Sequence, residues 1–358
     1  MEDIKFMKIA LKLAARGMGF TEPNPMVGAA VVKNGRILAT GYHHKYGADH
    51  AEREALKNVT EPGATLYVTL EPCTHFGKTP PCVDFLLEKK IKRVVMAMPD
   101  PNPLVNGQGI RKLEENGISV NVGTLQDMAH KLNRHYIKYM SAHLPYVTIK
   151  AGVSLDGKVT DKFRKSQWVT GEEMRRFSHS LRGEFSAIMV GVQTAVDDDP
   201  HLNIREQAWN EKKLYRIVLD TRNRLDTRLR IFGGDQEQYP LVIFSSQEAE
   251  NKTPKVKHHF FVKPCTGTGK GVDLREVLSI LYQLGIASVM VEGGGAIFNS
   301  FLEEKLYDEI ILGAAGTFIG GEASVQLYSQ GASVSNPIEL KEREITILKS
   351  GYFIRGYR

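Results

Sequence analysis

Two short stretches, HAEREALKN at residues 50–58 and PCTHFGKTPPC at residues 72–82, decide the fold of the first half of the chain. They supply one imidazole, His50, and two thiols, Cys73 and Cys82. Three protein ligands leave the fourth tetrahedral position of a zinc ion open, which is typical of a catalytic rather than a structural zinc site. Glu52 is suited to carry the proton of a zinc-activated water to a leaving amine. The stretch therefore predicts zinc-dependent hydrolysis.

The spacing of the two cysteines differs from the pattern best known for this chemistry. His-x-Glu followed by Pro-Cys-x-x-Cys is the signature of zinc-dependent nucleobase deaminases, in which the glutamate stays outside the metal shell. Here eight residues, Thr74–Pro81, separate the cysteines. They include His75 and Lys78, which suit an anionic polar substrate, and two prolines that can begin a helix with Cys82 in its first turn. The alternative is a closed structural site with His75 as the fourth ligand, but it leaves Glu52 without a role.

The composition is that of a globular protein, and 358 residues with 42% hydrophobic content predict two domains. Of three cysteines, two are assigned to the metal, so no disulfide framework is available. No segment resembles a signal peptide or a membrane span, and we expect a cytoplasmic protein. The formal charge of +6 comes without a dense Lys/Arg block interleaved with aromatic residues. This argues against nucleic acid and leaves small phosphorylated ligands compatible.

Hydrophobic periodicity predicts helices that alternate with strands in the first half of the chain. The opening helix, at residues 3–19, has Asp3 as a possible N-cap. Asn34-Gly35 between two apolar runs predicts a hairpin. Asn24, held between two prolines, either aims an amide at a ring substrate or shapes a corner. Such alternation favours a sheet with helices on its faces and metal ligands at strand ends and helix starts. The other predicted elements are helices at 50–58, 82–90 and 124–142, strands at 64–70 and 93–98, and a helix followed by a strand within 108–123.

A second domain begins near Pro145, where a new apolar strand starts and the metal-ligand pattern ends. Its most informative stretch is ASVMVEGGGAIFNSF at residues 287–301. A strand reaches Glu292, three glycines follow, and a helix opens at about Ala296. Bare amides at a helix N-terminus bind anionic phosphates well, although a tight strand-to-helix turn would leave the same pattern.

Two other stretches of the second domain look like ligand sites and are interpreted otherwise. PCTGTGKG at residues 264–271 resembles a P-loop but lacks its first glycine and its final Ser or Thr, so we reject a nucleotide site there. Asp197, Asp198 and Asp199 point in different directions and precede a proline, which favours a polar loop over a magnesium site. One of these aspartates can still contact a ligand.

Eight motifs together resemble one family. PNPMVG, HAE, PCTHFGKTPPC and PDPNP stand in the first half, followed by KAGVSLDGK, SQW, DDDPHLNIR and VEGGGAIF in the second. They resemble the bifunctional riboflavin-biosynthesis deaminase/reductases, over essentially the whole chain and including the eight-residue cysteine spacing. The resemblance implies an α/β protein, with a cytidine-deaminase-like three-layer deaminase domain at residues 1–144. A dihydrofolate-reductase-like α/β reductase domain would follow at residues 145–358.

The resemblance also implies two reactions and two cofactors. With Zn²⁺, the first domain would hydrolyse the 2-amino group of 2,5-diamino-6-ribosylamino-4(3H)-pyrimidinone 5′-phosphate. With NADPH, the second would reduce the ribosyl chain, giving 5-amino-6-ribitylamino-uracil 5′-phosphate. The partners implied are this small phosphorylated substrate and further copies of the chain, in a dimer or tetramer formed through the reductase domain, with neither nucleic acid nor membrane.

Individual roles follow from the resemblance at matching positions. His50, Cys73 and Cys82 would hold zinc, Glu52 would shuttle the proton, and Lys150 would lie near the carbon that is reduced. The residues implied to hold the deaminase substrate are Asn24, His43, His75 and Lys78. Those implied to lie along the sugar phosphate in the reductase are Ser166, Arg182, Leu202, Arg205 and Glu292. The guanidinium groups of Arg182 and Arg205 suit a phosphate. Those implied to contact NADPH are Gly152, Trp168, Thr194, Asp198, Thr221, Gly293, Gly294, Gly295, Ala296, Ile297 and Phe298.

The chain departs from the family's pattern at DKFRK, residues 161–165, and at GAAGTFIGG, residues 313–321. The first is bulkier and more charged than usual, and the second lacks an expected proline and lysine. Two other functions stay open from sequence. A nucleic-acid-editing deaminase with an unrelated partner domain would need stacking aromatic residues near its site. A zinc-stabilised binding module would tolerate the loss of Glu52.

Overall fold

The computed structural model divides the chain into two compact units, Met1–His143 and Leu144–Arg358. The sequence predicted a division one residue further along. Each unit has its own hydrophobic core. The described residues are 1–76, 80–103, 105–161, 163, 169–246, 256–262, 271–321, 325–328 and 337–358. No helix within these ranges is long and apolar enough to span a membrane.

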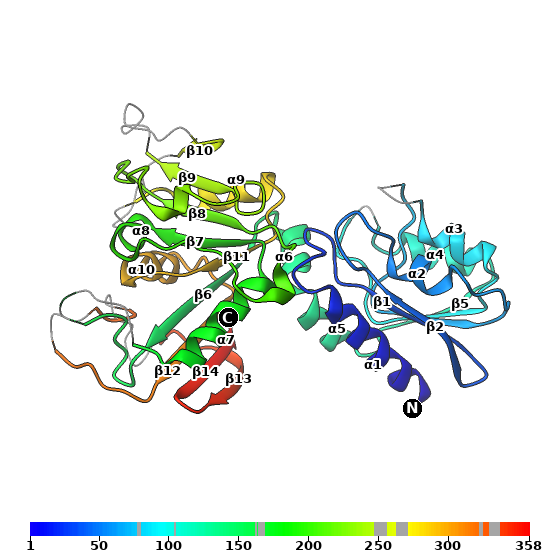
Figure 1. Ribbon diagram of the computed structural model, residues 1–358. Helices are drawn as coiled ribbons and strands as arrows, with labels where there is room; N and C mark the ends of the chain where they lie inside the picture. The colour runs from blue at the N-terminus through cyan, green and yellow to red at the C-terminus, as the bar shows by residue number, and fades with distance from the viewer. Residues whose placement is uncertain are drawn as a thin grey trace. The chain divides into compact units, whose positions relative to one another are not determined.

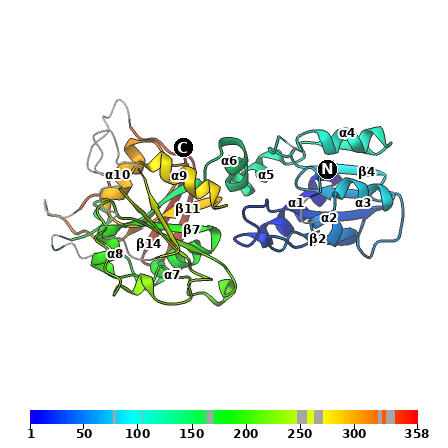
Figure 2. The ribbon, with the colours of Figure 1, turned by 90° about the horizontal axis from the view of Figure 1, so that it is seen from above.

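The first unit is built on a sheet with helices on both faces (Figures 1 and 2). Its described strands are β1 (Gly28–Lys33), β2 (Arg36–Tyr42), β3 (Thr65–Val68), β4 (Arg93–Met96) and β5 (Ser119–Val122). Its described helices are α1 (Glu2–Ala14), α2 (Ala51–Leu56), α3 (Cys82–Glu88), α4 (Gln108–Glu115), α5 (Gln126–Leu132) and α6 (Arg134–Ala142). The strand order is β2-β1-β3-β4-β5, antiparallel around β1 and parallel from β3 to β5.

Two glycines let helices pack closely on opposite faces of this sheet. A Cβ atom on Gly28 would collide with the backbone of Ala10 in α1, and one on Gly41 would collide with the backbone of Ala51 in α2. Gly41 pairs with Ala29, the neighbour of Gly28, so the two glycines face opposite sides of the sheet. α1 and α2 therefore cover opposite faces, and the predicted three-layer arrangement is confirmed.

The hairpin predicted at Asn34-Gly35 is also confirmed. The two residues have φ angles of 50° and 73°, and Lys33 pairs with Arg36 across the turn. Positive φ at both central positions is what a tight two-residue hairpin turn requires. The turn, together with a register shift between Val31 and Val32, sets the pairing in which β2 ends immediately before His43.

The opening helix is shorter than predicted, and its N-cap is a different residue. α1 ends at Ala14, with Met1 as its N-cap. Asp3 lies inside the first turn, where its carboxylate accepts hydrogen bonds from Arg93 at 2.7 Å and from the hydroxyl of Tyr67 at 2.8 Å. The N-cap prediction for Asp3 is wrong because contacts with the sheet use that carboxylate.

The single helix predicted at residues 124–142 is two helices. α5 ends at Leu132 and α6 begins at Arg134, because Asn133 between them has φ −98° and ψ 21°. The side chain of Asn133 binds the backbone of Met26, which is 107 positions away in the sequence. Periodicity cannot show a break that comes from such a distant contact.

The second unit is built on a nine-stranded mixed sheet within the described ranges (Figure 1). Its strands are β6 (Tyr146–Val153), β7 (Ala187–Gly191), β8 (Tyr215–Leu219), β9 (Leu241–Ser245), β10 (His258–Phe261), β11 (Ser288–Val291), β12 (Glu309–Ala315), β13 (Lys341–Leu348) and β14 (Gly351–Tyr357). Its described α-helices are α7 (Glu172–Leu181), α8 (Val192–Asp198), α9 (Leu274–Gln283) and α10 (Gly295–Glu303). The strand order is β10-β9-β8-β7-β11-β6-β12-β14-β13, and β14 runs antiparallel to both of its neighbours.

The centre of this sheet brings distant parts of the chain to one edge. β8, β7, β11 and β6 are consecutive parallel neighbours, so their carboxyl ends lie together. Glu292 follows β11 there, Thr221 comes two residues after β8, and Gly152 is near the end of β6. Ligands of open α/β sheets bind at this edge.

Candidate functional site

The three predicted metal ligands come together in the first unit. His50 directly precedes α2, Cys73 follows β3, and Cys82 is the first residue of α3. Nδ1 of His50 lies 3.5 Å from Sγ of Cys73 and 3.3 Å from Sγ of Cys82. All three ligand atoms lie within 4.8 Å of one another. Pro81 is the N-cap of α3, as the two prolines predicted.

These separations fit a zinc ion. Zn–N and Zn–S bonds of about 2.0 and 2.3 Å at tetrahedral angles put ligand atoms roughly 3.5–3.8 Å apart. Two soft thiolates and an imidazole are donors that suit zinc. His75 lines the neighbouring pocket but is not a member of the cluster, which argues against the closed site. The donor set is that of an open, catalytic zinc centre.

Glu52 is placed to act on what binds at this centre. It lies in the first turn of α2, is only 3% exposed, and lines the same pocket. Burial raises the pKa of its carboxyl. A raised pKa suits a group that must both accept and donate a proton near neutral pH.

A pocket of about 390 Å³ opens beside the cluster, and Asn24, His43 and His75 are among its walls. Nδ1 of His43 lies 2.9 Å from the carbonyl oxygen of Asp49, which can only accept, so Nδ1 carries the proton. Nε2 of His43 then accepts a hydrogen bond from Nδ2 of Asn24 at 3.3 Å. Because this bond uses the amide nitrogen of Asn24, its carbonyl oxygen stays available to accept a hydrogen bond from a ring N–H of a ligand.

Part of the pocket wall was missed from sequence. It comes from the PDPNP turn after β4, from the loop after β2, and from α6, and comprises Tyr46, Asp100, Asn102, Tyr136, Tyr139 and Met140. The first segment carried a signal, because PDPNP is one of the motifs of the family resemblance. α6 carried none, since three apolar or aromatic residues at helical spacing are typical of any packed helix.

Glu71 holds the PDPNP turn in place. Its carboxylate accepts hydrogen bonds from the backbone N–H groups of Asp100, Gly107, Gly109 and Ile110, at 2.9 to 3.2 Å. Gly109 and Ile110 are in the first turn of α4, where N–H groups lack helical partners and negative charge is favourable. Glu71, directly before Pro72 and Cys73, thus connects a wall of the pocket to the segment that carries a metal ligand.

Asp100 is a buried carboxyl whose ionisation weakens the fold. Its Oδ1 accepts a hydrogen bond from the Tyr136 hydroxyl at 2.8 Å and one from the N–H of Asn102 at 2.9 Å. Burial outweighs these bonds and raises the pKa of Asp100 to about 6. Because this folded-state pKa exceeds the ordinary 3.8, the folded chain holds the proton more tightly than the unfolded chain. The Asp100 contribution to stability therefore falls as pH rises from about 4 through 6.

We expect Asp100→Asn to raise the free energy of unfolding of the first unit, by up to about 3 kcal/mol at pH 8 and by less at pH 5. The amide can keep both hydrogen bonds because both are made to Oδ1. Calorimetry of the intact chain at the two pH values measures the effect. Asp127→Asn, at an exposed position of α5, is the control. An equal effect of Asp100→Asn at both pH values would exclude the carboxylate charge as its cause.

The second candidate site lies where β11 passes into α10. α10 begins at Gly295, with Gly294 as its N-cap, one residue before the predicted start. The N–H of Gly294 donates to Oγ1 of Thr194 at 3.2 Å. Gly293 has a φ of 135°, and a Cβ on Gly295 would lie 2.8 Å from the carbonyl oxygen of Gln326. Among the described residues, the nearest atom to a Cβ on Gly294 would be Oγ1 of Thr194 at 3.8 Å, so this part of the chain leaves the space in front of Gly294 open.

Charged side chains converge beside the glycine loop. Arg182 donates two hydrogen bonds to Glu292, of 3.0 and 2.8 Å. Burial alone would raise the pKa of Glu292, but the charges of Arg182 and Lys150 lower it to about 2. Arg205 is exposed, and within the described ranges neither Arg205 nor Lys150 has an ion-pair partner. Burial lowers the pKa of Lys150, so its charge is not counted here. The guanidinium groups of Arg182 and Arg205 against one carboxylate already leave this edge positive, as a phosphate site requires.

His179 is a further group of this edge that sequence reasoning missed. It lies in the last turn of α7, three residues before Arg182. Burial lowers the pKa of its imidazole to about 4, and the charges of Arg182, Arg205 and Lys150 act in the same direction. Its Nδ1 is buried without a hydrogen-bond partner in the part of the chain that the structure describes. The imidazole is therefore neutral at physiological pH.

The other predicted residues of the second unit have different surroundings. A Cβ on Gly152 would lie 3.1 Å from Cγ2 of Thr170, and Asp198 is the last residue of α8. Ala296 is exposed in the first turn of α10. Side chains that are buried in the hydrophobic cores, and would meet a ligand only through their backbones, are those of Leu202, Ile297 and Phe298.

Some predicted residues cannot be located. Lys78, Ser166 and Trp168 lie outside the described residues, as does most of DKFRK. The other departure, GAAGTFIGG, is mostly the end of β12 and the turn after it. Its Ile319 and Gly320 donate backbone hydrogen bonds to the carboxylate of Asp156, at 3.0 and 2.7 Å. A carboxylate from the SLDG turn thus fixes this segment.

Comparisons with known proteins cover both units. Residues 145–354 match the family model of the RibD C-terminal domain, and residues 1–98 match that of the cytidine and deoxycytidylate deaminase zinc-binding region. The chain is 42% identical over 325 residues to the riboflavin biosynthesis protein RibD of Aquifex aeolicus, covering 90% of this chain and 89% of that protein. It is 37% identical to RibD of Escherichia coli, covering 90% of each.

Solved structures agree over nearly the full length. A diaminohydroxyphosphoribosylaminopyrimidine deaminase/5-amino-6-(5-phosphoribosylamino)uracil reductase from Thermotoga maritima superposes with a TM-score of 0.87 at 35% identity, covering 99% of this chain and 98% of that one. RibD of Acinetobacter baumannii gives a TM-score of 0.87 at 32% identity, with the same coverage. The similarity therefore extends over both candidate sites and both sheets.

Proposed function

Because the chain belongs to the RibD family of bifunctional riboflavin-biosynthesis enzymes, we propose that its two units act in turn on one phosphorylated pyrimidine. The chain is an enzyme with deaminase and reductase activities, and its cofactors are zinc and NADPH. The first reaction removes the 2-amino group of 2,5-diamino-6-ribosylamino-4(3H)-pyrimidinone 5′-phosphate as ammonia. The second reduces the ribosyl chain to ribityl, giving 5-amino-6-ribitylamino-uracil 5′-phosphate.

For deamination, we propose His50, Cys73 and Cys82 as the zinc ligands and Glu52 as the proton shuttle. Zinc, when bound, supplies a water activated for attack on the carbon that bears the amino group. Glu52 accepts the proton and delivers it to the leaving amine, a role supported by its burial and raised pKa. The residues proposed to hold the pyrimidine and its phosphate are Asn24, His43, His75 and Lys78.

For reduction, we propose that the glycine loop binds phosphate of NADPH through backbone N–H groups at the start of α10. NADPH, when bound, supplies the hydride. The space before Gly294 that the described residues leave open supports this binding mode. The excess positive charge of Arg182 and Arg205 supports a substrate phosphate nearby. The remaining proposed substrate contacts are Ser166, Leu202 and Glu292, and the remaining proposed NADPH contacts are Gly152, Trp168, Thr194, Asp198 and Thr221.

One observation carries the deaminase assignment: three metal ligands converge beside a pocket that also contains the buried Glu52. Purified protein with the diaminopyrimidinone phosphate should release ammonia without NADPH. It should oxidise NADPH only after deamination. Ammonia release and nicotinamide absorbance measure the two steps.

We further expect the two units to work when separated between His143 and Leu144. The motivation is that metal ligands and glycine loop lie in different compact units. Residues 1–143 should release ammonia at a rate within about tenfold of the intact chain, and residues 144–358 should oxidise NADPH when given deaminated substrate. A folded first fragment that oxidises NADPH would show that the division of labour is wrong.

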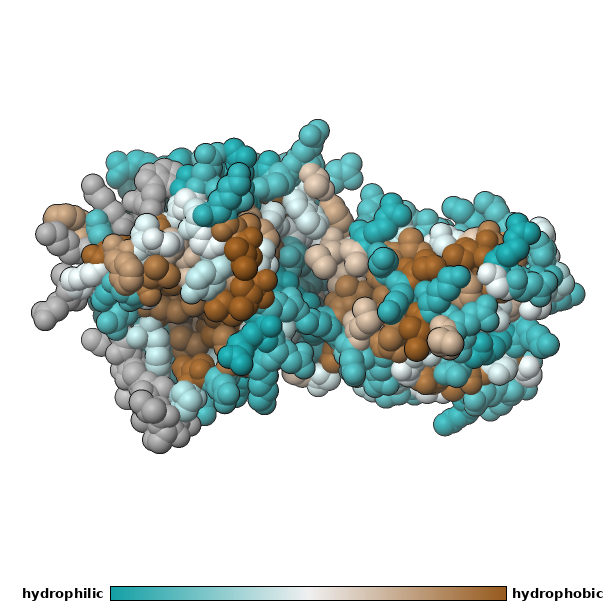
Figure 3. Space-filling model, turned by 90° about the horizontal axis from the view of Figure 1, so that it is seen from below, coloured by the Kyte–Doolittle hydropathy of each residue, from teal (hydrophilic) through white to brown (hydrophobic). Residues whose placement is uncertain are grey.

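Neither alternative from the sequence is favoured. Family membership does not favour a nucleic-acid-editing deaminase with an unrelated second domain. A zinc-stabilised binding module would give the buried Glu52 carboxylate beside the metal ligands no function. We propose a homo-oligomer, a dimer or a tetramer, that forms through the second unit, supported by the exposed Ile345 and Ile347 on its edge strand β13. Apolar surface on that unit is visible in Figure 3. A cytoplasmic location is proposed from the absence of a disulfide framework.

A further inference from the structure

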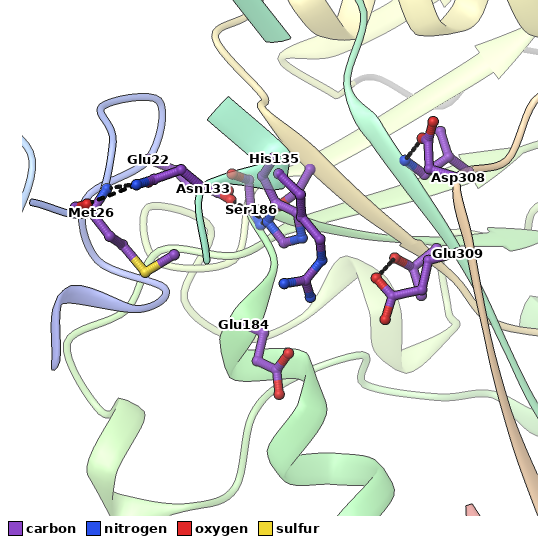
Figure 4. A network of polar contacts seen from close by, with 12 residues as sticks. Glu22, Met26, Asn133, His135, Glu184, Ser186, Asp308 and Glu309 are labelled. Atoms are coloured by element: carbon purple, nitrogen blue, oxygen red, sulfur yellow. Dashed lines mark hydrogen bonds and ion pairs between the residues drawn. The ribbon is translucent and has the colours of Figure 1, made fainter. Parts of the chain in front are cut away.

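Asn133, at the break between α5 and α6, contacts the loop that carries Asn24. Asn133 is 1% exposed, and its side-chain amide makes two hydrogen bonds to one residue of that loop. The N–H of Met26 donates to Oδ1 at 2.8 Å, and Nδ2 donates to the carbonyl oxygen of Met26 at 3.0 Å. Figure 4 shows both bonds. The Asn133 side chain therefore satisfies both backbone groups of Met26, as a neighbouring β-strand would.

The same loop is held a second time at its other end. Nδ1 of His135, in the first turn of α6, lies 2.7 Å from a carboxylate oxygen of Glu22. Asn24 lies between these two anchored residues. Its own amide then bonds to Nε2 of His43 on the pocket wall. The position of the Asn24 carbonyl oxygen in the pocket thus depends on where Met26 and Glu22 are fixed.

We propose that Asn133 is a positioning residue of the deaminase, which acts on the substrate only through Asn24. This rests on the proposed function, in which Asn24 holds the pyrimidine. Asn133 does not line the pocket, and it lies outside residues 1–98, which match the deaminase zinc-binding model. The role also explains why the helix breaks here, since the side chain must leave the helical path to reach Met26.

Only an amide satisfies both backbone groups of Met26. An N–H donor and a carbonyl acceptor of one residue need an acceptor and a donor side by side, which Asn offers. Aspartate would keep the acceptor but would set a second oxygen against the Met26 carbonyl. Alanine would remove both bonds and free the loop. Because aspartate would also bury an uncompensated charge at this position, Asn133→Asp should lower activity at least as much as Asn133→Ala.

The test is a double-mutant cycle of Asn133→Ala and Asn24→Ala in the full chain. In the native background, Asn133→Ala should lower kcat/KM for ammonia release roughly tenfold, because a small displacement of a substrate-holding group is enough. In the Asn24→Ala background it should change kcat/KM by less than about twofold. Zinc content and NADPH-dependent reduction of deaminated substrate should stay normal. Asn116→Ala, at the exposed end of α4, is the matched control and should change neither activity.

Several results would overturn the inference. Equal losses in both backgrounds would mean that Asn133 does not act through Asn24. Loss of zinc together with activity would mean that it only stabilises the unit. If Asn133→Ala fails to fold, the cycle is run with the uncharged, polar Asn133→Ser, and additive losses there have the same meaning. A native chain that releases no ammonia would instead refute the proposed function, and the inference with it.

Discussion

Replacing Glu52 by glutamine is expected to lower ammonia release by roughly 100- to 10,000-fold, the usual contribution of a general acid–base group, while zinc stays bound. Glutamine has nearly the same shape, so the pocket and α2 should keep their structure. It cannot take up or deliver a proton. Glu52 is not one of the three ligands whose atoms converge, so its charge is not needed to hold the metal. Ammonia release and metal content of the purified variant, measured together, test both halves of the statement.

A neighbouring glutamate provides the control. Glu54 lies on the same short helix, where it accepts a hydrogen bond from the N–H of Tyr42 at 2.7 Å and contacts His44. Glu54→Gln removes the same charge from α2 without touching the pocket and should remain active within a fewfold. Full deaminase activity in a zinc-replete Glu52→Gln protein would refute the proton-shuttle mechanism. Loss of zinc from Glu52→Gln would indicate that Glu52 is itself a zinc ligand.

The metal centre was predictable because its signals are local in the sequence. His50 and Glu52 are two residues apart, and the prolines before Cys82 start the helix that presents the thiol. Three ligands with an unligated carboxylate nearby have few other chemical interpretations. The same holds for the hairpin at Asn34-Gly35, where two residues with positive φ decide the turn. In such cases the chemistry of a few adjacent residues determines the local structure.

The part of the deaminase pocket that α6 supplies could not be predicted, because its residues meet their partners only in the folded chain. Tyr136 donates a hydrogen bond to Asp100 across 36 positions of sequence, and Asn133 reaches Met26 across 107. In the second unit, Arg182 and Glu292 form an ion pair across 110 positions. Nothing in the pattern around His179 shows that four charged groups surround it. From sequence alone, Asn133, Tyr136 and His179 are interpreted only as parts of helices.

The glycine loop was predictable as a strand-to-helix connection, but the three glycines were not distinguishable. The structure separates them. Gly293 is needed for its backbone conformation, with φ 135°, and Gly295 for its closeness to the backbone of Gln326. At Gly294, an N-cap with φ −93°, neither reason applies. The proposed approach of an NADPH phosphate to this backbone would account for the absence of a side chain there.

Gly294→Val is therefore expected to raise the dissociation constant of NADPH about 100-fold, the cost of one or two hydrogen bonds to a charged phosphate. The valine side chain would occupy the open space in front of the loop without straining the backbone. The hydrogen bond from its N–H to Thr194 would remain. Ammonia release should stay near normal, because the zinc ligands are in the other compact unit. Titration of NADPH fluorescence measures the affinity.

Two other glycines provide controls, because valine should have a different effect at each of them. Gly233 has φ −88°, and among the described residues a Cβ there would have one neighbouring atom within 4 Å, at 3.5 Å. Gly233→Val should therefore leave NADPH affinity unchanged. Gly293→Val should weaken binding too, but with a lower melting temperature, because valine is strained at positive φ. A folded Gly294→Val protein with native NADPH affinity would mean that no phosphate approaches this backbone. The three glycines would then be a turn between β11 and α10, and the cofactor would have to bind elsewhere on the sheet edge.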